Sequence, residues 1–591
     1  MTQEVERGDS LPDRQLTLRA ALTGMVLGGV LCLSNLYVVL KTGWSLGVTI
    51  TATIVAFAFF SALKRAGLIS RPFSVLENNA VASIASSGGW MTGGGNMAAL
   101  PALLLLTGQR PAGLAMFAWF ALIASLGVFV AIPLKRQFID VEKLPFPMSV
   151  ATAEALKAMH ASLPLPRGAE PLGATALGGK EGRGEGRTLA GSPAKLLLRA
   201  GLVASLFTLW RDTHLAWSIP GRLTLAGWLG FDVSVVLAGG GSLMKPRTAF
   251  SLLLGAVLTW GVLVPLLLTS GEFKTAVQFT LWPAAALLAS SALTGLALQW
   301  RMLGRGLDEL RLVLRQRAAP SKTEAPTWWF FAGFAVLAPP LVGLMWWLFG
   351  VPLWAGALAM PLALLVGVIS ARVTGETDVT PTKAMGPLTQ LVAGVALPAN
   401  VTANVMSANV TAGVGLHAAD LLSDLKTGWV LGADPRKQVY AQFLGLLVGA
   451  AVVVPAFNLL VPDASVLGSE QFPAPAVMVW AGVSKVLALG VTGLPAFAKE
   501  AMGLAALLGV ALVLLEARVK EPRKKWIPSA SALGIAMVLP AATALTMVAG
   551  ALLGMFARRR WTEASLTPVA SGLIAGESVT GVVMALIRVL T

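Results

Sequence analysis

Long hydrophobic runs separated by short polar connections fill almost the whole chain. The first run covers residues 16–40 and the second covers residues 44–63, where Lys64-Arg65 closes it. A helix needs about 20 apolar residues to cross a bilayer, so these runs predict transmembrane helices. Along the chain the pattern predicts an all-α polytopic membrane protein with about 16 transmembrane helices, some of them broken or re-entrant.

Glycine and proline interrupt several of these runs. Residues 73–107 are too long for one straight helix and contain Gly88-Gly89 and then Gly93-Gly94-Gly95-Asn96. Backbone groups freed at such a break need protein or cavity water as partners. We therefore predict a discontinuous helix facing a translocation path. Three other irregular stretches are predicted: re-entrant segments at residues 143–160 and 471–485, and a further broken region at residues 238–265.

The composition agrees with a membrane protein. Of 591 residues, 55% are hydrophobic and 13% are charged. The formal net charge of +16 arises from Lys and Arg in the connections, which is the pattern of cytoplasmic loops rather than of a nucleic-acid-binding surface. It predicts a cytoplasmic N-terminus and favours a multi-pass protein of a bacterial inner membrane. Residues 1–16 lack the features of a cleaved signal peptide.

Few residues suit metal or covalent chemistry. The chain has one cysteine, Cys32, and three histidines, which excludes a disulfide framework and disfavours an all-protein metal site. Residues 173–180 resemble a phosphate-binding loop, but Glu181 stands where the motif needs Ser or Thr. No catalytic motif is present. We expect no cofactor, no ATPase domain and no enzymatic activity.

A basic segment divides the chain into parts of similar size. Residues 301–327 carry five arginines with leucines at helical spacing, which predicts an amphipathic cytoplasmic helix. We therefore predict an N-terminal transmembrane half, residues 1–300, and a C-terminal half, residues 328–591. The pentapeptide Leu-Lys-Thr-Gly-Trp at residues 40–44 recurs at residues 425–429 and indicates internal duplication. The first copy follows the first predicted span of its half, whereas the second copy comes about four spans into the other half. Smaller repeat units or coincidence are therefore alternatives to duplication of a whole half.

Carboxylates within hydrophobic surroundings are candidates for taking up a coupling proton. An ionisable side chain near the membrane centre costs about 2.5 to 3.5 kcal/mol, so it is retained for a reason. Alternatives are an aqueous position for Glu154, a nearby cation for Asp424 and a helix cap for Glu577. The proton-coupling candidates are Glu154, Glu376, Asp378, Asp420, Asp424 and Glu577.

A second set of residues could bind a polar solute. Lysines attract carboxylates, and amides or hydroxyls can line a polar cavity. Glu77 is equally suited to cap a helix. Asn400, Asn404, Ser407, Asn409 and Thr411 form a polar seam in a double span, and helix packing alone rarely needs so many polar groups. The substrate-binding candidates are Tyr37, Lys41, Glu77, Asn78, Asn79, Lys245, Asn404, Ser407, Asn409 and Lys426.

Together these motifs resemble the oligopeptide transporter superfamily, in its prokaryotic branch related to yellow-stripe-like carriers of metal chelates. The resemblance implies about sixteen helices built by duplication, and proton-driven symport of small peptides or metal chelates. Two signatures of the peptide-carrying eukaryotic branch, Asn-Pro-Gly and Lys-Ile-Pro-Pro-Arg, are missing. The motifs that carry the resemblance are Leu36–Trp44, Glu77–Asn79, Lys143–Pro147 with Ala151–Glu154, Gly239–Pro265, Thr374–Asp378, Leu425–Trp429 and Gly576–Ser578.

We therefore expect a proton-coupled carrier of a small peptide or a peptide-like metal chelate, embedded in a lipid bilayer. A sodium-coupled carrier or a channel for another small polar solute is one alternative. A membrane-embedded enzyme is another, and it would need a catalytic cluster that the sequence lacks. The sequence leaves the solute, the stoichiometry and the oligomeric state open, including a homo-oligomer.

Overall fold

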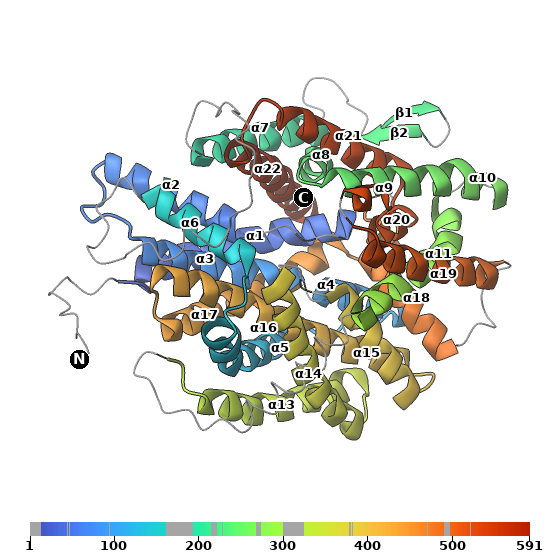
Figure 1. The fold of residues 1–591 in the computed structure, drawn as a ribbon, viewed down its shortest axis with the longest axis horizontal. Helices are drawn as coiled ribbons and strands as arrows, with labels where there is room; N and C mark the ends of the chain where they lie inside the picture. Colours follow the sequence, from blue (N-terminus) through green and yellow to red (C-terminus); the bar gives the residue numbers. More distant parts are fainter. Residues whose placement is uncertain are drawn as a thin grey trace.

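The described residues are almost entirely helical, apart from one antiparallel hairpin of β1 (Arg222–Ala226) and β2 (Leu229–Asp232) (Figure 1). Seven helices in the described part of the chain are long and apolar enough to cross a membrane by length and composition. The computed structural model describes residues 14–43, 45, 48–93, 95–160, 193–213, 222–226, 229–267, 273–298, 324–377, 380, 382–469, 471–489, 497–520 and 522–590.

The part of the chain before residue 300 forms two groups of helices. The first group holds α1 (Leu18–Thr42), α2 (Thr49–Arg65), α3 (Val75–Gly89), η1 (Trp90–Thr92), α4 (Asn96–Thr107), α5 (Gly113–Lys135), the π-helix η2 (Arg136–Val141) and α6 (Pro147–His160). The second holds α7 (Pro193–Thr213), α8 (Val235–Ser242), α9 (Pro246–Ala256), the π-helix η3 (Val257–Leu263), α10 (Val264–Leu267) and α11 (Phe273–Leu298).

The later part has a matching order after one extra helix, α13 (Trp328–Phe349). Its first group holds α14 (Leu353–Thr377), α15 (Thr382–Ala396), α16 (Val401–Leu431), α17 (Pro435–Leu460), η4 (Ala464–Val466) and α18 (Pro475–Leu489). Its second holds α19 (Ala498–Arg518), η5 (Arg523–Trp526), α20 (Ala530–Ala536), α21 (Ala541–Ala557) and α22 (Glu563–Leu590).

Helices of one part pack against helices of the other part. Helix α3 packs on α17 as α16 packs on α5, α7 lies along α22 as α19 lies along α11, and α8 packs on α21 as α20 packs on α9. The close packing depends on small residues, since a Cβ at Gly550 of α21 or Gly576 of α22 would overlap a backbone carbonyl of the facing helix. The two parts therefore repeat one arrangement and interlock.

Matched hydrogen bonds support this correspondence. Phe146 and Ala474 each precede the proline that begins a helix, α6 or α18, and each has a positive φ, of 40° and 45°. The Phe146 N–H donates to Gly375 O of α14 over 2.8 Å, and the Ala474 N–H donates to Leu40 O of α1 over 2.8 Å. Both acceptors stand two residues before the end of their helix. Each part thus holds a short helix of the other.

The structure bears on several predictions about helices and their breaks. The discontinuous helix at residues 73–107 is confirmed, because α3 ends at Gly89 and α4 begins at Asn96. The break predicted within residues 238–265 is also confirmed, between α8 and α9. The repeated pentapeptide is wrong as a marker of duplication: its first copy ends α1, whereas its second lies inside α16, which corresponds to the α3–α4 region. The predicted amphipathic helix at residues 301–327 lies mostly outside the described residues.

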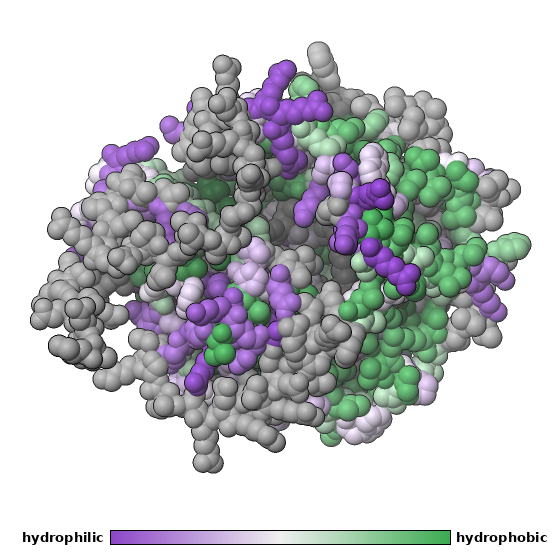
Figure 2. All heavy atoms as spheres, viewed as in Figure 1, coloured by the Kyte–Doolittle hydropathy of each residue, from purple (hydrophilic) through white to green (hydrophobic). Residues whose placement is uncertain are grey.

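Part of the outer surface of the described helices is apolar. Large hydrophobic side chains are exposed along α19, where Leu504, Leu507 and Leu515 are 71%, 68% and 48% exposed. Figure 2 shows hydrophobic residues gathered on the right of the view, where Figure 1 labels α11, α18 and α19. Water would not stabilise such a surface, so it suits contact with lipid.

Candidate functional site

A cavity of about 1020 Å³ lies between the two parts of the chain. Elements of both parts line it, among them α1, α2, η1 and α4 from the first and α16, α18, α20 and α22 from the second. Trp90 and Trp480 supply aromatic surface. Hydroxyl groups dominate its polar lining: Ser34, Ser45, Thr49, Thr51, Thr92, Ser149, Thr152, Thr248, Thr374, Thr380, Ser423, Thr427, Ser529, Ser531, Thr567 and Ser571.

Two carboxylates stand on one wall of this cavity. Asp420 and Asp424 lie one turn apart on α16, and with Ser423 and Thr427 they form the face that the helix turns to the cavity. Both are buried, with 8% and 3% of their surface exposed. They are the only charged side chains among the described residues that line the cavity.

One amide joins the pair. The Gln442 Nε2 of α17 donates to Asp424 Oδ2 over 2.6 Å and to Asp420 Oδ2 over 3.3 Å, and the Ser86 hydroxyl of α3 donates to Asp420 Oδ1 over 2.6 Å. No lysine, arginine or histidine among the described residues forms an ion pair with either carboxylate. Two close carboxylates repel each other when both are ionised, so a proton or a cation would stabilise the pair.

The broken helix reaches the same cavity. Gly93 and Gly95 line it between η1 and α4, and Gly95 has a φ of 84°, which glycine adopts without strain. A Cβ at Gly95 would overlap the Trp480 ring of α18. The break is thus fixed by a left-handed residue and by an aromatic ring from the other part of the chain.

The polar seam of α16 holds this break in place. Asn409 Nδ2 donates to Asn96 Oδ1 over 2.8 Å, and the Trp119 indole N–H donates to Asn409 Oδ1 over 2.8 Å. Asn404 Nδ2 donates to Gln390 O of α15, and Ser407 is buried. None of the three is among the residues that line the cavity. Asn404 and Asn409 hold neighbouring helices together, and the prediction that the three residues line a shared cavity is wrong in this conformation.

Glu77 caps a helix. It forms a capping box with Ser74 at the start of α3, and it accepts hydrogen bonds from Arg19 Nε over 2.8 Å and from the Thr17 hydroxyl over 2.7 Å. Asn78 Nδ2 lies 3.3 Å from Thr53 O, and Asn79 is buried. Neither asparagine lines the cavity, nor does Glu77. The capping alternative thus describes Glu77 better than a solute contact does.

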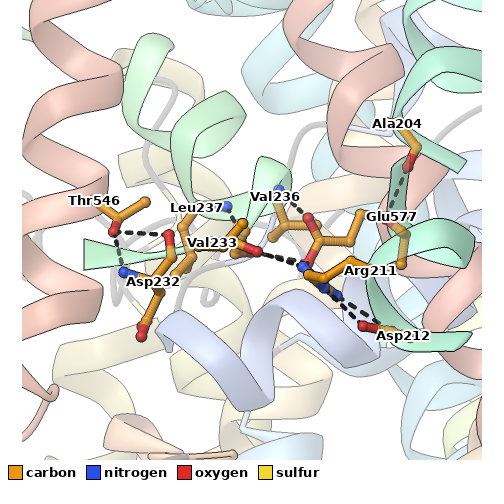
Figure 3. Close-up of polar contacts among 11 residues, drawn as sticks. Ala204, Arg211, Asp212, Asp232, Val233, Val236, Leu237, Thr546 and Glu577 are labelled. Atoms are coloured by element: carbon orange, nitrogen blue, oxygen red, sulfur yellow. Dashed lines mark hydrogen bonds and ion pairs between the residues drawn. The ribbon is translucent and has the colours of Figure 1, made fainter. Parts of the chain in front are cut away.

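Glu577 also forms hydrogen bonds that hold helices together (Figure 3). Its carboxylate accepts hydrogen bonds from Arg211 Nη1 of α7 over 3.1 Å, from the Ser234 hydroxyl over 3.0 Å and from the Val236 N–H over 2.8 Å. Arg211 also donates to Val233 O, just before α8. Glu577 therefore joins α22 to α7 and to the first turn of α8.

Two other proton-coupling candidates, Glu154 and Glu376, are not among the residues that line the cavity. Glu154 is exposed, with 62% of its side chain accessible, and pairs with Lys157 over 3.0 Å, so the prediction that it is buried is wrong. The reason is that Glu154 lies on the outward face of α6 with Met148 and Ala151, whereas Ser149 and Thr152 are turned inward. Glu376 pairs with Arg372 over 2.9 Å, and Arg372 also binds Glu142. Asp378 lies outside the described residues.

The predicted lysines and Tyr37 do not line the cavity either. Lys245 is exposed at the start of α9, and Lys41 is half-buried in the last turn of α1. Lys426 Nζ donates to Leu144 O over 2.9 Å and lies over the Trp429 ring. Tyr37 packs edge-on against Phe472. Because these lysines do not line the cavity, the prediction that they attract carboxylates of a substrate there is not supported.

Sequence reasoning missed several residues of the site. Gln442 and its neighbour Gln438 stand four residues apart in the apolar helix α17, and that spacing of two amides on one face was the available signal. Asn35 lines the cavity and donates to Gly89 O over 3.3 Å. The hydroxyl lining gives no signal, since single Ser and Thr residues are common in membrane helices. No cluster of three or more metal-binding side chains occurs in the part of the chain that the structure describes.

Interlocked repeats of helices, with interrupted segments around a polar cavity, are typical of membrane transporters. The chain belongs to the OPT oligopeptide transporter protein family, whose model matches residues 15–588. This agrees with the family resemblance drawn from the motifs.

The chain matches proteins that are named as transporters, and each match covers nearly the whole length of both chains. The chain is 27% identical to a Saccharomyces cerevisiae protein named for oligopeptide transport, with 98% of each chain covered. It is 24% identical to the iron-phytosiderophore transporter yellow stripe 1 of Zea mays, over 98% of this chain and 90% of the relative. It is 25% identical to a Haemophilus influenzae protein also named for oligopeptide transport, over 93% and 92%. The protein is thus an integral membrane transporter rather than an enzyme.

Proposed function

We propose that the protein is a proton-coupled symporter of small peptides or peptide-like metal chelates. The solute would occupy the cavity between the two parts of the chain, and the Asp420–Asp424 pair would take up the coupling proton. The observation that carries this proposal is the pair itself: two buried carboxylates, joined by Gln442 Nε2, on the wall of a cavity of about 1020 Å³.

The chemistry of coupling follows from the position of the pair. A proton that neutralises one carboxylate removes the repulsion between the two. It also lowers the cost of enclosing the site when the cavity closes, because a buried charge without a partner is unfavourable. Protonation and solute binding would then favour the same closed conformation, which is the requirement for symport.

The other carboxylates are weaker candidates for this role. Glu376 and Glu577 already have arginine partners, and Glu154 is in solvent. His417, one turn before Asp420, is fully buried and packs near Gly127 of α5 rather than on the cavity wall. Asp420 and Asp424 therefore remain the best supported coupling residues.

Uptake into proteoliposomes tests the proposal. A thermal-stability screen of purified protein against di- and tripeptides and against metal chelates first identifies a solute, since a ligand that binds the folded state raises its apparent stability. Uptake of that solute should exceed its equilibrium level only when the outside is more acidic, and Asp420→Asn and Asp424→Asn should abolish this excess. Accumulation driven by sodium, or unaffected in both variants, would contradict the proposal.

We also propose about sixteen crossings, with the N-terminus in the cytoplasm and the halves divided at residues 301–327, because basic residues recur in alternate connections. Labelling of single cysteines introduced at exposed loop positions, such as Gln109 and Ser465, tests this topology. Both positions should react from outside intact cells; reaction only after permeabilisation would contradict it.

A further inference from the structure

We infer that the cavity selects solutes that carry positive charge, held at the Asp420–Asp424 pair as an ammonium group or a chelated metal ion. This inference rests on the proposed function, because it names the class of solute that the same cavity takes. It departs from the expectation that lysines attract a negatively charged solute.

The first observation is the charge of the described lining. Its polar groups are hydroxyls, the Asn35 amide and two carboxylates, with no lysine, arginine or histidine among them. Hydroxyls can donate or accept hydrogen bonds and therefore do not select a sign of charge. The carboxylates do, because a cleft with walls of low dielectric concentrates the field of one sign.

The second observation is the lack of internal compensation. Three buried or partly buried arginines pair with other carboxylates: Arg19 with Glu77, Arg211 with Glu577, and Arg372 with the partly exposed Glu142 and Glu376. Every other deeply buried carboxylate thus has a cation, and only the pair at the cavity has none among the described residues. A buried acid pair of this kind is stabilised by a positive group that comes from outside.

The third observation is a set of polar atoms around the pair that lack partners. Gln442 Oε1 has no hydrogen-bond partner, although the amide nitrogen of the same side chain contacts both carboxylates, and Gln442 is fully buried. The Ser83 hydroxyl, which is 1% exposed, faces Asp424 and has no other hydrogen-bond partner. Neither Gln442 nor Ser83 is among the residues that line the cavity, so the positive group would meet the carboxylates themselves. The free Gln442 oxygen marks a shortage of hydrogen-bond donors beside the pair.

The inference is compatible with symport. The pair carries two negative charges when ionised, so one proton leaves one charge for the positive group of the solute. A negatively charged solute would instead meet repulsion at the same wall, at a separation too short for salt to screen.

Thiol labelling with charged reagents tests the inference without knowledge of the solute. The only cysteine, Cys32, is buried, and Cys32→Ala gives a background free of thiols. Ser423→Cys then places a reactive thiol on the cavity face of α16, at a sequence position between Asp420 and Asp424. Ser571→Cys places a second thiol on the cavity wall formed by α22, and these two thiols are the reporters. The reagents are methanethiosulfonates with a trimethylammonium, a methyl or a sulfonate group, and each rate is divided by the rate of the same reagent with free cysteine.

The normalised rate with the cationic reagent should exceed that with the anionic reagent by about tenfold or more at both reporters. Asp420→Asn with Asp424→Asn should bring the ratio close to one, whereas Glu154→Gln, which removes an exposed carboxylate, should leave it unchanged. An equal or reversed ratio would overturn the inference, and so would failure of all three reagents at both reporters. Uptake that does not respond to a pH gradient would contradict proton coupling, but it would not change the expected ratio of labelling rates. The two claims can therefore fail separately.

Discussion

The hydroxyl groups of Ser251 and Thr546 accept equivalent hydrogen bonds in the two parts of the fold. Ser251 Oγ of α9 accepts from the N–H of Ser529, the residue before α20. Thr546 Oγ1 of α21 accepts from the N–H of Asp232, at the end of β2 and three positions before α8 (Figure 3). Both bonds are 2.8 Å long, and both acceptors are the sixth residue of their helix. The short helices α8 and α20 are therefore held in the same way, each by a helix of the opposite part.

This equivalence predicts similar losses of stability in two distant variants. Ser251→Ala and Thr546→Val each leave a partly buried N–H without its acceptor, which should cost about 1–3 kcal/mol. Thermal unfolding in detergent measures the effect, with Thr213→Val at the exposed end of α7 as a control that should change little. A loss confined to one of the two variants would contradict the structural equivalence.

Gly95 should tolerate no side chain, for two separable reasons. Gly95→Ala places a Cβ in a left-handed conformation, at about 1–2 kcal/mol, and also against the Trp480 ring. Gly108→Ala is the matched control, since Gly108 has a φ of 70° but open space around its Cα. Thermal unfolding should show a larger loss at Gly95, and uptake should fall only there. Equal losses at both positions would mean that Trp480 does not fix the break.

Glu577 should behave as a structural residue. Glu577→Gln weakens the bond to Arg211 and leaves that guanidinium less well compensated in a buried place, so stability should fall by several kcal/mol. The uptake that remains should still respond to a pH gradient. Glu154→Gln, at an exposed ion pair worth about 0–1 kcal/mol, should change neither property. Loss of the pH response in Glu577→Gln with stability unchanged would instead make Glu577 a coupling residue.

Local sequence signals predicted the broken elements well. Glycines at residues 88–95 predicted the interruption between α3 and α4, because few other residues accept the backbone that such a break needs. The capping alternative for Glu77 was also available from Ser74 and Glu77 at capping-box spacing. In both cases the physical cause lies within one turn of the residue.

The grouping of polar residues could not be predicted in this way. Asn409, Glu577 and Asp420 are all costly polar groups in apolar helices, and the sequence does not say which of them meets a partner from a helix far along the chain. Arg211 satisfies Glu577 across 366 positions of sequence, whereas no cation reaches Asp420 among the described residues. Only the three-dimensional packing separates a structural carboxylate from one left at a cavity.

The central claim is that the Asp420–Asp424 pair couples proton movement to solute movement. Proteoliposomes that enclose a pH-sensitive dye measure this directly when a solute found in the thermal-stability screen is added outside, with no initial pH gradient. The account predicts acidification of the interior with the wild-type protein, and uptake without acidification, or no uptake, with Asp420→Asn and Asp424→Asn. Acidification of wild-type extent in both variants would contradict it.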